Sequence, residues 1–398
     1  MKKERFVILD ALRAIAGLTV PLFHIFENLG RLPAKYESWC GHGYLAVEFF
    51  LLLMGYMLAY AYDRRWEEGM SLWGFFRRRL VRLHPLVISG VLLGLVVYFL
   101  QGTFGEVWLG RWSATMPAWQ VLLYALWAMT MVPVVGCGGM INPFNACSWT
   151  LYYEYAGNIL YALGLRKLGK RVLLGCALVA LFFWVCFVMH VNLNGIFGTH
   201  VALFDKVASP KMRWSIVCGW QDVAWHVYGA FVRLALPLFL GLLLARLKWR
   251  ITLKKGALGL AVLVFVGVLY TPFTYRLGGP GHYWVNALFE ILAVTVVFPA
   301  LILVGVGNRV DPASRLARVL AFFAELSYPL YMSHFMFIGL FYSWVSAFAK
   351  THGTAAVFAG SFVFYLLLIA LACLVMRFWD RPIQKKMMFQ PKNRSGQK

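Results

Sequence analysis

Two ionisable side chains stand out in the first apolar segment, roughly residues 6–29, which contains the run DALRAIAGLTVPLFH. Arg13 and His24 are eleven residues apart, so on an α-helix they lie within about 20° of one face and about 16 Å apart along the axis. A guanidinium can stabilise developing negative charge, and an imidazole can act as a general base or nucleophile. Ionisable groups inside a bilayer are costly, so the pair predicts a functional site. The structural alternative is an arginine that reaches the interface and a histidine satisfied in the core.

Charged residues in the next two segments could complete this site. Glu48 lies in the apolar run GYLAVEFFLLLMGY, where it needs a cavity or a partner such as Arg13 or an arginine of the following loop. That loop is expected to include RRRLVRLHP, in which Arg78, Arg79 and Arg82 could bind phosphates. Arg79 and Arg82 are three residues apart and would share a helix face. An orientation signal with contacts to anionic lipids is the alternative.

Two later segments add further candidates. In SWTLYYEYAG, Glu154 follows Trp149 and Tyr152 and is expected one turn into a helix, on its outer side. Aromatic rings beside a carboxylate suit a sugar, although an interfacial aromatic belt gives the same pattern. In LSYPLYMSHFMF, His334 is expected to be buried and bonded to a backbone carbonyl.

The composition predicts an all-α, polytopic integral membrane protein. The 398 residues are 61% hydrophobic and 14% charged, with a mean hydropathy of +0.69. A soluble domain of this size could not bury so much apolar surface. The formal net charge of +22 is spread in short clusters between apolar segments, which indicates membrane orientation rather than nucleic-acid binding.

The apolar segments predict about ten transmembrane helices, with both termini in the cytoplasm according to the distribution of lysine and arginine. Residues 118–136 are expected to form a re-entrant or interfacial segment, because a full span there would place the basic run RKLGKR outside. One transmembrane domain, residues 1–376, is expected to precede a flexible basic cytoplasmic tail, residues 377–398.

Seven cysteines are present, and none belongs to a CxxC or His/Cys cluster with the spacing of metal ligands, so no metal site is predicted. Cys137 and Cys147 fall near outer loops. A disulfide between them and two free thiols are equally compatible with the sequence.

Together these stretches resemble the family-three membrane acyltransferases that O-acetylate cell-surface sugars of bacterial envelopes. The matching motifs follow the family's order: LDALRAIAGLTVPLFH, VEFFLLLMGY, RRRLVRLHP, SWTLYYE, LSYPLYMSHF and RFWDRPIQ. The chain departs from the family pattern at Glu48 (usually Asp), Met54 (usually Ser or Thr), His84 (usually Tyr or Phe) and Asp380 (usually Glu).

The resemblance implies an integral membrane O-acyltransferase. It would move an acetyl or other short acyl group from cytoplasmic acyl-CoA, a co-substrate rather than a permanently bound cofactor, to a hydroxyl of a cell-envelope glycan. Its other partners would be a lipid-linked sugar and membrane lipids, and its location the bacterial inner (cytoplasmic) membrane, as a multi-pass protein. The implied catalytic residues are His24, Arg13 and Glu154, the implied co-substrate ligands Arg78, Arg79 and Arg82, and the implied supporting residues Asp10, Glu48, Trp149, Tyr152 and His334.

Two other classes of function fit parts of the pattern. A proton-coupled transporter or exporter of a lipid-linked glycan could relay protons through Arg13, His24 and Glu48. The lack of an obvious internal repeat and the arginine-rich loop count against it. A membrane scaffold would use its loops for partners and would not depend on His24.

Overall fold

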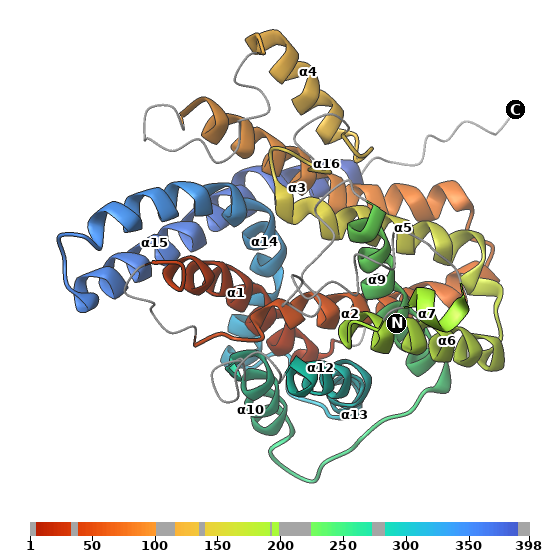
Figure 1. Cartoon of the computed structure of the whole chain (residues 1–398). Helices are drawn as coiled ribbons and strands as arrows, with labels where there is room; N and C mark the ends of the chain where they lie inside the picture. Colours follow the sequence, from red (N-terminus) through yellow and green to blue (C-terminus); the bar gives the residue numbers. More distant parts are fainter. Residues whose placement is uncertain are drawn as a thin grey trace, which may run out of the picture.

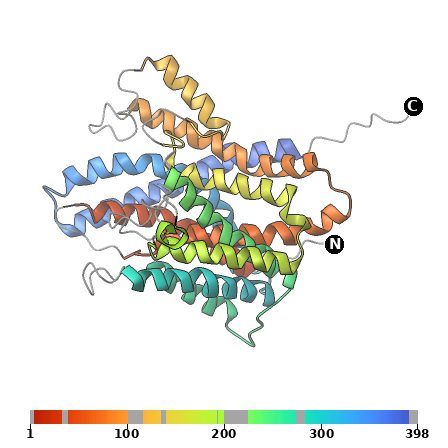
Figure 2. The same ribbon diagram turned by 45° about the vertical axis from the view of Figure 1, so that its right-hand side comes forward.

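The computed structural model describes residues 5–32, 39–100, 116–134, 140–191, 193–198, 224–272 and 283–388. Every regular element in these ranges is a helix and none is a strand, which confirms the predicted all-α class. The longer helices are α1 (Val7–Leu29), α2 (Ala46–Glu67), α3 (Leu72–Leu100), α5 (Trp149–Leu163), α6 (Lys170–Val188), α9 (Ala224–Leu247), α10 (Ala257–Tyr270), α14 (Arg315–Phe348) and α15 (Thr354–Val375). Figure 2 shows most of them running side by side as one bundle.

Seven helices in the described ranges are long and apolar enough to cross a membrane. This supports a polytopic membrane protein, while ten spans and cytoplasmic termini stay predictions. The segment expected to be re-entrant contains α4 (Ala118–Met129), whose 12 residues extend about 18 Å. That is shorter than the roughly 30 Å hydrocarbon core of a bilayer. In both ribbon views α4 lies at the edge of the bundle (Figures 1 and 2).

The arginine-rich stretch is a helix, so its prediction as a loop is wrong. Helix α2 continues to Glu67 and α3 already begins at Leu72. The turn between them places Gly69 at φ 87°, a left-handed conformation that suits glycine. Phe75 and Val81 are buried in the first half of α3, whereas Arg77, Arg78 and Arg82 are exposed, so this part of the helix has a packed face and an open face. Arg79 is the buried arginine of the stretch.

The first part of the C-terminal tail is also ordered, which corrects the expectation of a flexible tail from residue 377. A π-helical segment, η8 (Met376–Asp380), leads into α16 (Arg381–Met388). The Trp379 indole N–H donates to the Pro85 carbonyl at 2.7 Å, and both Arg381 contacts to Glu325 are 2.7 Å. These bonds fix the start of the tail to α3 and α14. Residues 389–398 lie outside the described ranges.

Helices α1, α3 and α5 pack along α14, and the pairing of their residues gives their directions. Along α1, Arg13 contacts Ala324 and His24 lies against His334, so α1 and α14 are parallel. Helix α5 is antiparallel to α14. Thr150 bonds to Tyr331, whereas Cys147, which comes earlier in the chain than Thr150, contacts His334, which comes later than Tyr331. Helix α3 is parallel to α14, since the Tyr328 hydroxyl donates to the Leu83 carbonyl and Gly90 lies against Met332.

Helices α2 and α9 approach each other closely through glycines. A Cβ built on Gly55 would lie 2.5 Å from the Leu238 carbonyl oxygen, and one on Gly241 would lie 2.2 Å from that of Leu52. Both obstacles are backbone atoms, which cannot move aside without shifting a helix. Small residues at such contacts are typical of helix packing in membranes.

We therefore expect Gly55→Val to destabilise the protein by about 1–3 kcal/mol, since the added carbons overpack a close helix contact. Thermal unfolding of the detergent-purified protein measures this effect. Gly175→Val in α6 is the matched control, because a Cβ there meets no atom within 4 Å. Equal melting temperatures for the two variants would contradict the tight α2–α9 contact.

Candidate functional site

The two residues singled out in α1 both face α14. An Nη2 of Arg13 donates to the Ala324 carbonyl at 3.2 Å. Ten residues further along α14, the His334 ring stacks on His24 with 5.4 Å between ring centroids. The predicted arrangement, a cation and an imidazole three turns apart on one helix face, is present. The site therefore has two levels, one around Arg13 and one around His24, about 16 Å apart along α1.

His24 is oriented by a carboxylate of its own helix. Its Nδ1 lies 3.2 Å from Glu27 Oε2, and Arg31 holds the other Glu27 oxygen at 2.7 Å. An ionised carboxylate only accepts hydrogen bonds, so Nδ1 carries the proton of a neutral His24 and Nε2 offers its lone pair. The His24 side chain is 18% exposed. This base-and-carboxylate pair is the arrangement used to prepare a histidine for proton transfer.

His334 is fully buried, and its Nδ1 lies 2.8 Å from the Tyr331 carbonyl and 3.1 Å from that of Leu330. This confirms the prediction of a buried histidine bonded to backbone carbonyls. Because carbonyls accept, Nδ1 donates and the Nε2 lone pair of His334 also points into the site.

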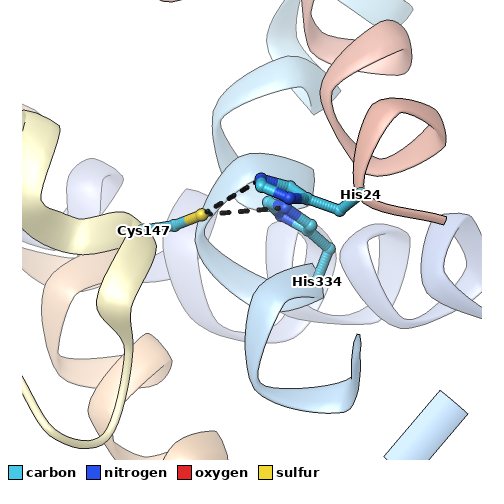
Figure 3. Close-up of side chains that lie close together, drawn as sticks. All are labelled: His24, Cys147 and His334. Atoms are coloured by element: carbon cyan, nitrogen blue, oxygen red, sulfur yellow. Dashed lines mark hydrogen bonds between the residues drawn. The ribbon is translucent and has the colours of Figure 1, made fainter. Parts of the chain in front are cut away.

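Cys147 completes the level around His24. Its Sγ lies 3.8 Å from His24 Nε2 and 3.9 Å from His334 Nε2, and the three side chains converge from three separate elements (Figure 3). The three donor atoms lie within 4.8 Å of one another and are of kinds that bind zinc. The sequence spacing does not reveal this cluster, because its members come from distant segments of the chain, and the prediction that no metal is bound stays a prediction. Cys147 is a free cysteine, and Cys137 lies outside the described ranges.

The short helix that presents Cys147, η4 (Ala146–Ser148), is tied to α14. The Tyr331 hydroxyl donates to the Cys147 carbonyl at 3.0 Å and accepts from the Thr150 hydroxyl at 2.9 Å. The Asn145 amide donates to the Met332 carbonyl at 2.9 Å. These bonds fix the sulfur relative to both histidines.

The level around Arg13 is rich in arginines. Buried Arg79 of α3 pairs with Glu154 of α5 at 2.8 Å, and the Glu154 carboxylate also interacts electrostatically with Arg13 and Arg82. The expectation that Glu154 lies further out, on the acceptor side with His24, is wrong. Helix α5 runs antiparallel to α1, so seven residues beyond Cys147 the chain has advanced about 10 Å toward the arginines.

The remaining charged candidates surround this second level. Arg78 and Arg82 are exposed on α3, where they are four residues apart and share a face. Asp10 accepts from Arg5 at 2.7 Å and lies 3.7 Å from Arg13. The charged neighbours of Arg13 include the carboxylates of Asp10, Glu154 and Glu325, whereas Arg78 and Arg82 are exposed on α3.

Glu48 is paired, but its partner is neither Arg13 nor a residue of the arginine-rich stretch. Arg233 of α9 contacts Glu48 at 2.5 Å, with 3% and 0% of the two side chains exposed. The Arg233 guanidinium also lies 4.6 Å over the Trp149 ring. Trp149 therefore supports a buried ion pair instead of standing open to a sugar. The Tyr152 hydroxyl donates to the Ile141 carbonyl at 3.4 Å.

Sequence reasoning missed two residues of the site. Glu27 is three residues after His24, a spacing that places it beside the imidazole on a helix, so this signal was present. Cys147 carries no such signal, because its neighbours come from segments more than a hundred residues away in both directions.

Comparison with known proteins gives three findings. The family model described as "Acyltransferase domain" (acyltransferase family 3) matches residues 6–377. A curated relative, "Protein 2 in picA locus" of Rhizobium radiobacter, is 38% identical over 98 residues, which is 24% of this chain and 47% of the relative, so the match spans about half of that protein. No solved structure matches the chain. Since the family model covers nearly the whole chain, the protein belongs to the acyltransferase 3 family of membrane acyltransferases.

Proposed function

We propose that the protein is an O-acyltransferase that moves an acetyl or other short acyl group from cytoplasmic acyl-CoA to a hydroxyl of a cell-envelope glycan. Membership of the family supports an acyl-transfer reaction, and the long apolar helices support a location in a membrane. The proposed location is the inner membrane of a bacterium. The observation that carries the proposal is the His24–Glu27 pair, which leaves a basic imidazole nitrogen inside the bundle.

His24 would act as the general base for the acceptor. Attack of a hydroxyl on a thioester requires removal of its proton, and His24 Nε2 has a lone pair because Nδ1 donates to Glu27. Glu27 stabilises the imidazolium that forms. A general base of this kind contributes about 10²–10⁴-fold to a reaction rate.

The arginine level would bind the co-substrate. CoA carries phosphates, and guanidinium groups form strong, paired hydrogen bonds with phosphate oxygens. Arg82 and Arg78 are exposed, whereas Arg79 is held by Glu154 and would shape the positive field. With its phosphates at this level, an extended donor would lie along α1 toward His24.

The direction of α1 supports a two-sided reaction. Helix α5 continues past Glu154 at the end of the bundle that carries Arg13 and Arg79, and the basic run at residues 166–171 follows it there, as expected for a cytoplasmic surface. Acyl-CoA would then enter from the cytoplasm, and the glycan would approach the opposite level around His24.

Sided membrane vesicles test this proposal. Acetyl-CoA labelled in its acetyl group is supplied to inside-out vesicles that contain the protein and an envelope glycan fraction. We expect label in an ester-linked glycan product, and far less label when sealed right-side-out vesicles receive the same donor. Equal transfer in both orientations would contradict the two-sided arrangement. A failure with acetyl-CoA and succinyl-CoA alike, under conditions where vesicles export a lipid-linked glycan, would favour a transporter.

Arg82→Ala is expected to raise the KM for acyl-CoA about tenfold or more, since a charge-assisted hydrogen bond contributes about 1.5–3 kcal/mol, and to leave kcat nearly unchanged. Initial rates over a range of donor concentrations measure both constants. Arg171→Ala removes an exposed arginine of α6 and is the matched control. A fall in kcat with an unchanged KM would remove Arg82 from the donor site.

A further inference from the structure

Cys147 has the surroundings of a catalytic nucleophile. Its Sγ is within hydrogen-bond distance of His24 Nε2, at 3.8 Å, and His24 Nδ1 is in turn held by Glu27 at 3.2 Å. A nucleophile, a base and a carboxylate that orients the base form the same relay as the triads of acyl-transfer enzymes on unrelated folds. From the geometry of Cys147, His24 and Glu27 we infer that Cys147 carries the acyl group as a thioester between donor and acceptor.

The hydrogen-bond roles in the cluster favour this inference. Both imidazoles donate through Nδ1, so both Nε2 lone pairs face one sulfur that carries a single proton. The thiol can donate to only one of them at a time. Burial in an apolar surrounding favours the neutral thiol, so attack requires transfer of its proton to a neighbouring base. His24, paired with a carboxylate, is the better stabilised cation of the two histidines.

The position of Cys147 suits a carrier. The residue is 5% exposed, which shields a thioester from hydrolysis by bulk water. Bonds from Tyr331 and Asn145 fix η4 on α14, so the sulfur is held in place before substrate arrives. Among the five described cysteines, only Cys147 lies in a cluster with histidines.

The proposed reaction has two steps, and atoms and charge balance in each. It rests on the proposed function, in which acyl-CoA is the donor and a hydroxyl group is the acceptor. First, His24 Nε2 takes the thiol proton, Sγ bonds to the acyl carbon, the carbon–sulfur bond to CoA breaks, and the CoA thiolate receives the proton. Second, His24 takes the proton of the acceptor hydroxyl, its oxygen bonds to the acyl carbon, the bond to Cys147 breaks, and the sulfur regains a proton. No oxidation or reduction occurs.

If Cys147 carries the acyl group, the protein should exchange the acetyl group between acetyl-CoA and free CoA even when no glycan acceptor is present. Purified full-length protein is incubated with acetyl-CoA and labelled CoA, and label entering acetyl-CoA is followed. We expect exchange by the wild type and at least about a 100-fold loss in Cys147→Ala, as on removal of a member of a catalytic triad. Cys186→Ala, which removes another buried thiol, should exchange like the wild type.

The covalent adduct gives a second, independent readout that needs only wild-type protein. After acid quenching, the peptide containing Cys147 should carry one acyl group, removable by neutral hydroxylamine. Three results would overturn the proposal: transfer to a hydroxyl acceptor by Cys147→Ala at the wild-type rate, an adduct on His24 instead, or one metal ion per chain that is lost in Cys147→Ser. Transfer without exchange would leave the proposed function intact, whereas absence of both would also remove the proposed function.

Discussion

His24→Gln is expected to lower kcat for acyl transfer about 10²–10⁴-fold, the usual contribution of a general base, with little change in the KM for acyl-CoA. The reason is the separation of the two levels: the arginines of α3 that would bind the donor lie near the level of Arg13, which is about three turns from His24 along α1. Glutamine keeps a polar side chain of similar length and cannot accept the proton. Steady-state rates with labelled acetyl-CoA measure the effect.

His352→Gln is the matched control for this experiment. His352 is exposed in the connection between α14 and α15 and bonds to Thr351 and Phe348. The His352→Gln variant should transfer the acetyl group at the wild-type rate. A His24→Gln variant that kept its kcat and lost only donor affinity would place His24 in binding rather than in proton transfer.

Glu48→Gln is expected to destabilise the protein by about 3–5 kcal/mol, because it leaves Arg233 as an uncompensated buried charge. The pair has 0% and 3% of its side chains exposed, and it joins α2 to α9 next to Trp149. Denaturant unfolding in detergent, followed by tryptophan fluorescence, gives the change in free energy.

Two variants check the cause. In the double variant Glu48→Met with Arg233→Met, both charges are absent, and most of the lost stability should return. Glu325→Gln breaks an ion pair with Arg381 in which both side chains are about half exposed, and it should cost about 1 kcal/mol or less. Equal losses for Glu48→Gln and Glu325→Gln would show that burial does not determine the strength of the pair.

The sequence predicts the class of the fold well, because the bilayer imposes it. In an apolar run long enough to cross a membrane, an α-helix satisfies the backbone hydrogen bonds within the segment itself, where no water is available. The boundaries of α3 were harder to predict, since arginines are read as loop residues although they form helices readily. Only the burial of Phe75 and Val81 shows that this stretch is one face of a packed helix.

Within the site, local spacing was informative and long-range pairing was not. Arg13 and His24 share a helix, so their common face follows from periodicity. The partner of Glu48 comes from α9, and the neighbours of Cys147 come from α1 and α14. Such contacts depend on how helices pack, and a single sequence contains no direct signal for them.

The depth of Glu154 illustrates the same limit. Its motif places it near the start of a helix, which suggested the outer level. The start of α5 lies beside His24, however, and two turns of antiparallel helix bring the carboxylate to Arg79. The direction and register of α5 relative to α1 therefore determine that Glu154 contacts Arg79 and not His24.

Chemical rescue tests the central claim, that the imidazole of His24 performs proton transfer. His24→Ala removes the ring and leaves a space that small imidazole can fill. We predict that His24→Ala transfers the acetyl group at least about 100-fold more slowly than the wild type, and that added imidazole restores part of the rate with a pH dependence set by its neutral form. Transfer by His24→Ala at the wild-type rate, with no response to imidazole, would contradict the account.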